Sequence, residues 1–112
     1  MMKLTYVLLY IFIFGCLSCK PDGAEPIDIH KDKCEFCKMS ISDIRFACEL
    51  VTAKGRVYKF DDILCANGYM NENKVSTSEV IWISDFDNSN ELIAAEKAFY
   101  IESDSLRSPM GG

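Results

Sequence analysis

The chain has 112 residues, enough for one domain, and 49% of them are hydrophobic, which favours a packed core over disorder. Its formal net charge of −5 provides no basic face for nucleic acid. The sequence contains one His, no obvious pairing of a nucleophile with a base, and neither of the glycine-rich motifs that bind nucleotide phosphates. We therefore expect a small globular protein that is not an enzyme and does not bind nucleic acid.

The first residues have the composition of a secretory leader. A single cation, Lys3, precedes an apolar stretch over Leu4–Phe14, which is shorter than the roughly 20 residues that span a bilayer. A small residue then precedes Cys19, as in a bacterial lipobox, and Cys16 is a competing lipidation site. We expect residues 1–18 to be a lipoprotein signal peptide and a lipid on Cys19 to anchor the protein at a membrane. A short membrane anchor that stays in place is the alternative.

Residues 19–33 are expected to form a tether between the anchor and the folded domain. Pro21, Gly23 and Pro26 oppose regular structure in this stretch. The domain then occupies residues 34–112. Its four cysteines lie outside the cytosol, where an unprotected thiol tends to be oxidised or to bind metal.

Alternating apolar and polar residues predict β structure after the tether. The expected elements are, in chain order, a strand from Arg45 to Ala53, a turn at Lys54-Gly55, a strand over Arg56–Phe60, a helix over Ile63–Asn71 capped by Asp61-Asp62, a strand over Val80–Phe86, one helical turn over Leu92–Glu96 and a strand over Ala98–Glu102. This order predicts an α+β fold, a small ββαβ unit with a mainly antiparallel sheet.

The strongest chemical signal is the motif Cys34-Glu35-Phe36-Cys37-Lys38-Met39. Two cysteines three positions apart can direct their sulfur atoms at one ion from a tight turn. Met39 adds a thioether, and a set of thiolates with a thioether selects Cu(I). The motif therefore predicts a Cu(I) site at Cys34, Cys37 and Met39.

Other interpretations of the cysteines stay open. They include a thiol–disulfide redox pair, a structural zinc site that uses Cys34, Cys37, Cys48 and Cys65, and a simple disulfide between Cys34 and Cys37. A haem attachment site is excluded, because Lys38 and not His follows Cys37.

Four further residues are weaker candidates. Cys48 alternates with apolar neighbours, which favours a core residue over a ligand. Cys65 falls in the first turn of the predicted helix, where the helix dipole would stabilise a thiolate, and it is either a ligand or a core residue. His30 is a ligand only if it completes the site, and a surface position is the favoured interpretation. Met110 follows Pro109 and precedes two glycines, so its thioether is expected on an exposed turn.

Five segments follow one another along the chain in a familiar order. They are F-C-K-M-S-I-S-D-I-R-F-A (Phe36–Ala47), G-R-V-Y-K-F-D-D-I-L-C (Gly55–Cys65), W-I-S-D-F (Trp82–Phe86), A-A-E-K-A-F-Y-I (Ala94–Ile101) and P-M-G-G (Pro109–Gly112). Together they resemble the NosL family of copper-binding lipoproteins associated with nitrous oxide reductase maturation, and the resemblance covers about residues 19–112. It implies a unit of the metal-binding, organomercurial-lyase-like fold.

The resemblance also implies a function and a set of site residues. It implies a periplasm-facing or cell-surface Cu(I) chaperone that hands copper to a membrane maturation complex and to nitrous oxide reductase. By position, the family's lipidated cysteine is Cys19, its C-x-x-C-x-M block gives Cys34, Cys37 and Met39, and its P-M-G turn gives Met110. Family members often have Met after the helix cysteine, where this chain has Ala66, and they continue past P-M-G-G. We therefore expect a C-terminally truncated form.

Overall fold

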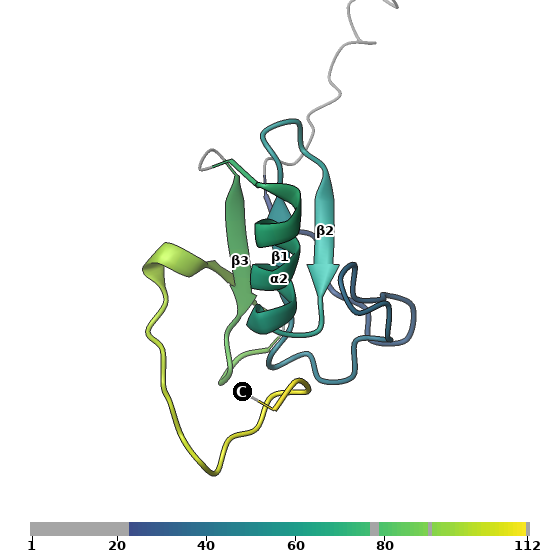
Figure 1. Cartoon of the computed structure of the whole chain (residues 1–112). Helices are drawn as coiled ribbons and strands as arrows, with labels where there is room; N and C mark the ends of the chain where they lie inside the picture. The colour runs from purple at the N-terminus through teal and green to yellow at the C-terminus, as the bar shows by residue number, and fades with distance from the viewer. Residues whose placement is uncertain (1–22, 77–78, 90, 112) are drawn as a thin grey trace, which may run out of the picture.

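The computed structural model describes residues 23–76, 79–89 and 91–111, which form one sheet with an α-helix packed on it (Figure 1). The elements are, in chain order, β1 (Cys48–Val51), β2 (Val57–Phe60), α2 (Ile63–Asn73), β3 (Val80–Ser84), β4 (Leu92–Ala94) and a 3₁₀ turn, η2 (Ala95–Lys97). Within this part of the chain no helix has the length and apolar character needed to cross a membrane. The predicted signal peptide and the lipidation at Cys19 or Cys16 lie outside the described residues.

The sheet has the strand order β2-β1-β3-β4, and all neighbouring strands are antiparallel. β1 and β2 form the predicted hairpin. Their loop has three residues rather than the two expected, because the N–H of Thr52 donates to the carbonyl of Arg56 (2.9 Å) and closes the loop there. Gly55 supplies the positive φ of 82° that such a loop requires.

One face of the sheet packs against α2 and forms the core. Alternation along β1 directs Cys48 and Leu50 to this face, and α2 lies across β1 between β2 and β3 in Figure 1. The buried residues of this core are Cys34, Cys48, Leu50, Phe60, Cys65 and Ala66. Burying one large apolar side chain contributes about 1.5–3 kcal/mol, so this face is what holds the helix on the sheet.

α2 begins and ends at defined caps. Asp62 is the N-cap, as predicted: its backbone is extended (φ −155°, ψ 179°) and its Oδ1 accepts the N–H of Cys65 (3.0 Å). At the other end Lys74 is left-handed (φ 49°), and its N–H donates to the carbonyl of Met70. The N-cap fixes where the helix begins and therefore where Cys65 lies.

Two predictions about the last part of the chain are wrong. Leu92–Ala94 is a strand and not a helical turn, because these residues pair with the edge of β3. Residues 98–102 form no strand: after η2 the chain leaves the sheet, Phe99 is 100% exposed, and the hydroxyl of Tyr100 donates to the carbonyl of Ala95 (2.7 Å). A strand needs a neighbouring edge, which a local pattern does not reveal. The α+β class and the ββαβ order are confirmed.

The opposite face of the sheet is covered by the second half of the predicted tether. Glu49, in β1, is fully buried on this face, and its Oε2 accepts the N–H of Glu25 (2.9 Å). Lys59, opposite Glu49 on β2, donates to Oδ2 of Asp32 (2.8 Å). These two contacts hold the chain against the sheet immediately before the C-x-x-C motif.

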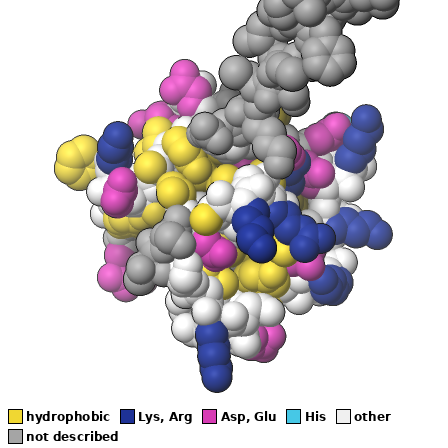
Figure 2. Space-filling view, turned by 90° about the horizontal axis from the view of Figure 1, so that it is seen from above, with side chains coloured by type: hydrophobic (Ala, Val, Ile, Leu, Met, Phe, Trp, Pro, Cys, Tyr) yellow, Lys and Arg dark blue, Asp and Glu magenta, His cyan; other side chains and the backbone are white. Residues whose placement is uncertain are grey.

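Charges of both signs are interspersed on the surface in Figure 2, where Lys and Arg side chains lie beside Asp and Glu side chains. The described ion pairs include Lys38–Glu35, Arg45–Asp43 and Lys59–Asp32. Because exposed pairs contribute at most about 1 kcal/mol each, the fold depends more on burial at the two faces of the sheet than on surface charge.

The buried carboxyl of Glu49 predicts that stability depends on pH. Burial raises its pKa to about 7, although the N–H of Glu25 and the ammonium of Lys59 act in the opposite direction. In the unfolded chain a glutamate titrates near its ordinary pKa of about 4.3, so between these values the folded state holds a proton that the unfolded state has lost. The contribution of Glu49 to the free energy of unfolding is therefore complete below the pKa of the unfolded chain, and it is lost as the pH rises through the pKa of the folded state.

We expect the free energy of unfolding, measured by urea denaturation, to fall by about 2 kcal/mol between pH 5 and pH 8. Glu49→Gln keeps an oxygen that can accept the N–H of Glu25 but has no proton to lose, so most of this slope should disappear. The control Glu72→Gln, on the exposed side of α2, should keep it. An unchanged slope in Glu49→Gln would show that another group is responsible.

Candidate metal centre

Three cysteine sulfur atoms meet where the C-x-x-C motif packs against α2. The Sγ atoms of Cys34, Cys37 and Cys65 all lie within 4.8 Å of one another. Three thiolates that bind one ion at a sulfur–metal distance of about 2.3 Å are about 4 Å apart, so closure on an ion needs a contraction of less than about 1 Å. The donor set and its spacing therefore fit a soft metal ion.

The C-x-x-C motif is a closed loop that is attached to the sheet. The N–H of Cys34 donates to the carbonyl of Met39 (2.8 Å), and the N–H of Lys38 donates back to the carbonyl of Cys34 (3.0 Å). Lys38 takes the left-handed conformation (φ 65°) that this reversal requires. The N–H of Glu35 donates to the carbonyl of Lys59 in β2 (2.8 Å), which fixes the loop at the edge of the sheet.

The third sulfur comes from α2, and a glycine makes the approach possible. A Cβ on Gly68 would lie 2.6 Å from Cζ of Phe36, which is too close for any side chain. Phe36 lies between the two cysteines of the motif, and Gly68 follows Cys65 by one helical turn. The absence of a side chain at Gly68 therefore lets the motif pack close to Cys65. The sequence gives no sign of this role, because Gly68 has no ligand atom in a side chain and belongs to no motif.

The three thiols ionise differently. Burial opposes ionisation of Cys34, but backbone N–H groups of Cys37, Asp61 and Phe36 donate to its sulfur, and the net effect lowers the pKa of Cys34. Burial raises the pKa of Cys37 and of Cys65, and the neighbouring Cys34 raises both further. Cys34 is therefore the most acidic of the three thiols, and metal binding would release the protons that the cluster holds. The predicted stabilisation of a Cys65 thiolate by the helix dipole is outweighed by burial.

Cys48 is a core residue, as the sequence favoured. It is fully buried, its Sγ donates to the carbonyl of Asp62 (3.4 Å), and it does not belong to the group of three sulfurs. Burial also raises the pKa of this thiol well above its ordinary value. The zinc alternative that used all four cysteines is therefore wrong in its ligand set. All four thiols, in the part of the chain that is described, are free.

The other predicted ligands are Met39, Met110 and His30, and all three are exposed. Met39, two residues after Cys37, is 55% exposed. Met110 is 41% exposed, and its N–H donates to Oδ2 of Asp62 (3.0 Å), at the helix end that carries Cys65. His30 lies in an exposed turn, where its N–H donates to Asp28 (2.9 Å), and it is not part of the described three-residue cluster. The roles of Met39, Met110 and His30 as ligands stay predictions.

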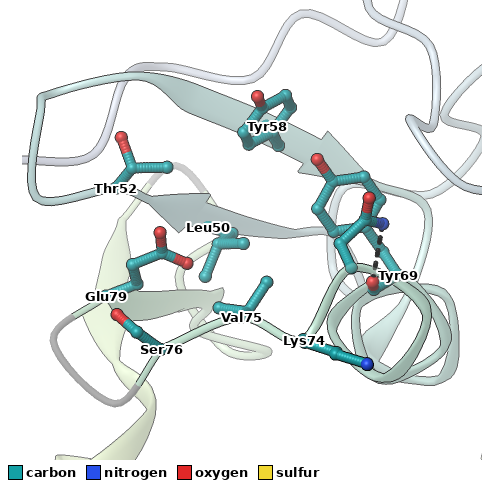
Figure 3. Close-up of a pocket in the computed structure, with 9 residues that line it drawn as sticks. Leu50, Thr52, Tyr58, Tyr69, Lys74, Val75, Ser76 and Glu79 are labelled. Carbon is teal, nitrogen blue, oxygen red and sulfur yellow. Dashed lines mark hydrogen bonds between the residues drawn. The ribbon is translucent and has the colours of Figure 1, made fainter.

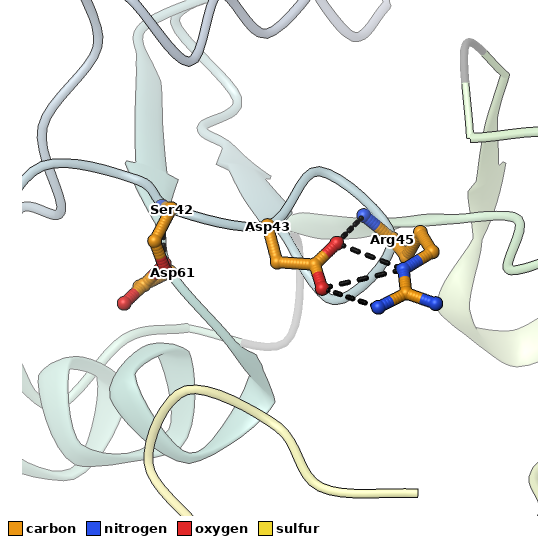
Figure 4. A network of polar contacts seen from close by, with 4 residues as sticks. All are labelled: Ser42, Asp43, Arg45 and Asp61. Atoms are coloured by element: carbon orange, nitrogen blue, oxygen red, sulfur yellow. Dashed lines mark hydrogen bonds and ion pairs between the residues drawn. The ribbon is translucent and has the colours of Figure 1, made fainter.

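Carboxylates fix the loop that connects the motif to β1 (Figure 4). Oδ1 of Asp61 accepts the N–H of Ser42 (3.1 Å), and the backbone of Asp61 is one of the groups that lower the pKa of the Cys34 thiol. Farther along the loop, Asp43 binds the guanidinium of Arg45 through both oxygens (2.7 and 3.0 Å). Asp61 therefore connects the loop to the sulfur cluster, a role that the sequence, which suggested only a helix cap, did not show.

A cleft of about 320 Å³ lies at the C-terminal end of α2, away from the sulfur cluster (Figure 3). Tyr58 and Tyr69 contact each other on one side of it, with ring centroids 5.2 Å apart, and Leu50 and Val75 lie between the strands and the chain that leaves the helix. Glu79 is the cleft's only carboxylate among its described lining residues. The cleft therefore lacks a metal-binding set, and the chemistry lies at the sulfur cluster.

Filling the space at Gly68 should weaken metal binding without weakening the helix. Gly68→Ala raises helix propensity by about 1 kcal/mol, yet its methyl group displaces the Phe36 ring and the loop that carries the two cysteines. Because overpacking costs about 1–3 kcal/mol, we expect the affinity for Cu(I), measured by competition with a chromogenic chelator, to fall about tenfold. The control Asn67→Ala, at an exposed position of the same helix, should keep the affinity.

Comparison with known proteins agrees with this arrangement. The family described as NosL matches residues 26–112. This range includes the C-x-x-C motif, the helix cysteine and the turn that carries Met110. No curated protein and no solved structure matches significantly. Since the match covers most of the chain and all three sulfurs of the cluster, the protein belongs to the NosL family.

Proposed function

We propose that this protein is an extracytoplasmic Cu(I)-binding lipoprotein that supplies copper for the maturation of nitrous oxide reductase. The observation that carries the proposal is the cluster of Cys34, Cys37 and Cys65, whose sulfurs lie within 4.8 Å of one another in a member of the NosL family. Copper is the cargo of this site and not a catalytic group, in keeping with an accessory, binding role.

The number and type of ligands support Cu(I) over zinc. Structural zinc takes four ligands in a closed tetrahedron, whereas two or three soft sulfur ligands satisfy Cu(I). The described cluster contains three cysteines, and Cys48, the fourth thiol, is bound elsewhere. Met39, two residues after Cys37, offers a thioether, which Cu(I) accepts and zinc sites rarely contain.

Unequal burial of the ligands supports delivery rather than storage. Cys34 and Cys65 are 1% exposed, but Cys37 is only partly buried and Met39 is exposed. An ion held here is covered on the side of the sheet and accessible on the side of Cys37. A recipient protein could therefore replace the outer ligands one at a time, so that copper moves without being released into solution.

Membership of the NosL family motivates a proposal for the recipient and the location. We propose that a membrane maturation complex and, through it, nitrous oxide reductase receive the copper, and that a lipid on Cys19 holds the protein on the periplasmic or outer surface. Copper on this side of the membrane would explain why the donors are thiols kept in a buried cluster, since exposed thiols there are readily oxidised.

Thiol–disulfide exchange is the second candidate function. The sulfur atoms of three thiols lie within 4.8 Å of one another, and the lowered pKa of Cys34 would make it the attacking group. The two functions differ in which residues they need. Exchange requires one pair of cysteines and no methionine, whereas Cu(I) binding uses all three cysteines and Met39.

Substitutions of the sulfur ligands separate copper binding from its alternatives. We expect wild-type protein, purified anaerobically, to bind one equivalent of Cu(I), and Cys65→Ser to lower its affinity at least tenfold, because the third thiolate is lost. Cys34→Ser with Cys37→Ser should abolish binding. Met39→Leu, which conserves volume, should weaken Cu(I) binding and leave thermal stability nearly unchanged.

The matched control is Cys48→Ala, which removes the thiol that lies outside the cluster. It should destabilise the fold slightly and leave the Cu(I) stoichiometry at one. Stoichiometric zinc in the reduced protein, with Met39→Leu affecting neither metal, would reject the copper proposal. Disulfide reductase activity that survives Met39→Leu and needs only Cys34 and Cys37 would support exchange instead.

Lipidation is tested separately. If Cys19 carries the lipid, the mature protein partitions into the detergent phase of Triton X-114, and Cys19→Ser moves it to the aqueous phase or blocks processing. Cys16→Ser is the matched control and should leave partitioning and processing unchanged. Wild-type protein that stays with the membrane and keeps an uncleaved N-terminus would instead identify a retained membrane anchor.

A further inference from the structure

One carboxylate connects the helix of the metal cluster to the C-terminal turn. Asp62 is 1% exposed, and its Oδ1 accepts the N–H of Cys65 (3.0 Å). Its other oxygen, Oδ2, accepts both the hydroxyl of Ser108 (2.9 Å) and the N–H of Met110 (3.0 Å). A segment 46 to 48 residues distant in sequence is thereby attached to the end of α2 where the sulfur cluster lies.

These bonds place a methionine within reach of the cluster. Because the N–H groups of Cys65 and Met110 bind the two oxygens of one carboxylate, their nitrogen atoms lie within about 8 Å of each other. A methionine side chain is long and has three rotatable bonds, so its sulfur can cover the remaining distance. The Met110 side chain is 41% exposed and is therefore not held in a core.

A hydrogen bond closes the turn, whereas the hydrogen bonds described for the chain that leads to it are all local. Ser108, Pro109 and Gly111 occupy the positions that a type I turn prefers, and the N–H of Gly111 donates to the carbonyl of Ser108 (2.9 Å). In residues 99–107 the described hydrogen bonds join near neighbours, and Phe99 and Ile101 are 100% and 82% exposed. The turn can therefore leave Asp62 without disturbing the sheet.

We propose that Asp62 is a positioning residue that holds Met110 at the sulfur cluster as an additional Cu(I) ligand, and that its two bonds to the turn act as a releasable clasp. The proposal rests on the Cu(I) site proposed above and adds how the last ligand reaches it. When the bonds to Oδ2 break, Met110 withdraws and one coordination position opens to a recipient. The helix cap at Oδ1 stays in place, so the three cysteines keep their positions.

Asp62→Asn separates the two roles of this residue. An asparagine keeps an oxygen that caps the helix, and asparagine is as good an N-cap as aspartate. Its amide nitrogen, however, cannot accept the N–H of Met110. We expect this variant to keep its helix and fold, judged by circular dichroism, and to bind Cu(I) about tenfold more weakly than wild type.

A double-mutant cycle distinguishes positioning from a general structural effect. Asp62→Asn should cost about tenfold in Cu(I) affinity when Met110 is present, and nothing further in the Met110→Leu background. Ser108→Ala, which loses one of the two bonds and leaves the helix cap intact, should show a smaller loss with the same dependence on Met110. Ser105→Ala, in the same segment but bonded only to Ser103 among the described contacts, is the control and should change nothing.

A second readout follows Met110 directly. With Ag(I), a soft ion used as the probe, Met110 of the full chain should be protected from peroxide oxidation, as measured by peptide mass spectrometry. Asp62→Asn should remove this protection, while Met39 stays as it is in wild type. Because a cap that only stabilises the helix would affect both methionines or neither, this comparison is specific to the clasp.

The outcomes divide clearly. Equal loss of affinity in both backgrounds, or no loss in either, overturns the clasp while Cu(I) binding through Cys34, Cys37 and Cys65 stands. Failure of Cys65→Ser to weaken binding overturns the proposed copper site, and the clasp with it. If Asp62→Asn loses the helix, Ser108→Ala becomes the deciding variant. A loss of Cu(I) affinity in Ser108→Ala that is the same with Met110 and with Met110→Leu would then overturn the proposal.

Discussion

The cluster of three cysteines, the candidate metal centre, depends on the burial of the first turn of α2. A helix N-terminus leaves backbone N–H groups without partners, and burying them requires an acceptor from elsewhere. Asp62 supplies it from the N-cap position and is itself buried. With this end of the helix fixed against the sheet, Cys65 faces the C-x-x-C loop, and the core residue Cys48 is bonded to the carbonyl of the same aspartate.

Burial of the cluster opposes ionisation of its thiols, and the pKa values of the three cysteines are shifted in different directions. Removing thiols from water disfavours their ionisation, yet a metal ion binds thiolates. Backbone N–H groups gathered on Cys34 overcome burial for that sulfur, while Cys37 and Cys65 keep raised pKa values. The raised pKa values of Cys37 and Cys65 limit the charge that the folded apoprotein must bury, and these thiols would lose their protons only on binding a metal.

The two faces of the sheet carry different parts of the structure. One face carries α2 and the sulfur cluster, while the other carries Glu49 and Lys59, which hold the segment that precedes the motif. The loop with Cys34 and Cys37 passes from one side to the other, and Glu35 attaches it to β2 on the way. Its position is therefore set at both ends before a metal is bound.

The sequence by itself determined the fold class, the hairpin, the N-cap at Asp62 and the Cys34–Cys37 pair, because each depends on neighbours within a few residues. It left Cys65 open between ligand and core, and it misassigned residues 92–94 and 98–102, because strand pairing depends on an edge that is distant in sequence. Only the tertiary structure decided that Cys65 joins the cluster and Cys48 does not, since both are cysteines in apolar surroundings. The space at Gly68 and the shared carboxylate of Asp62 likewise exist only once separate segments have packed together.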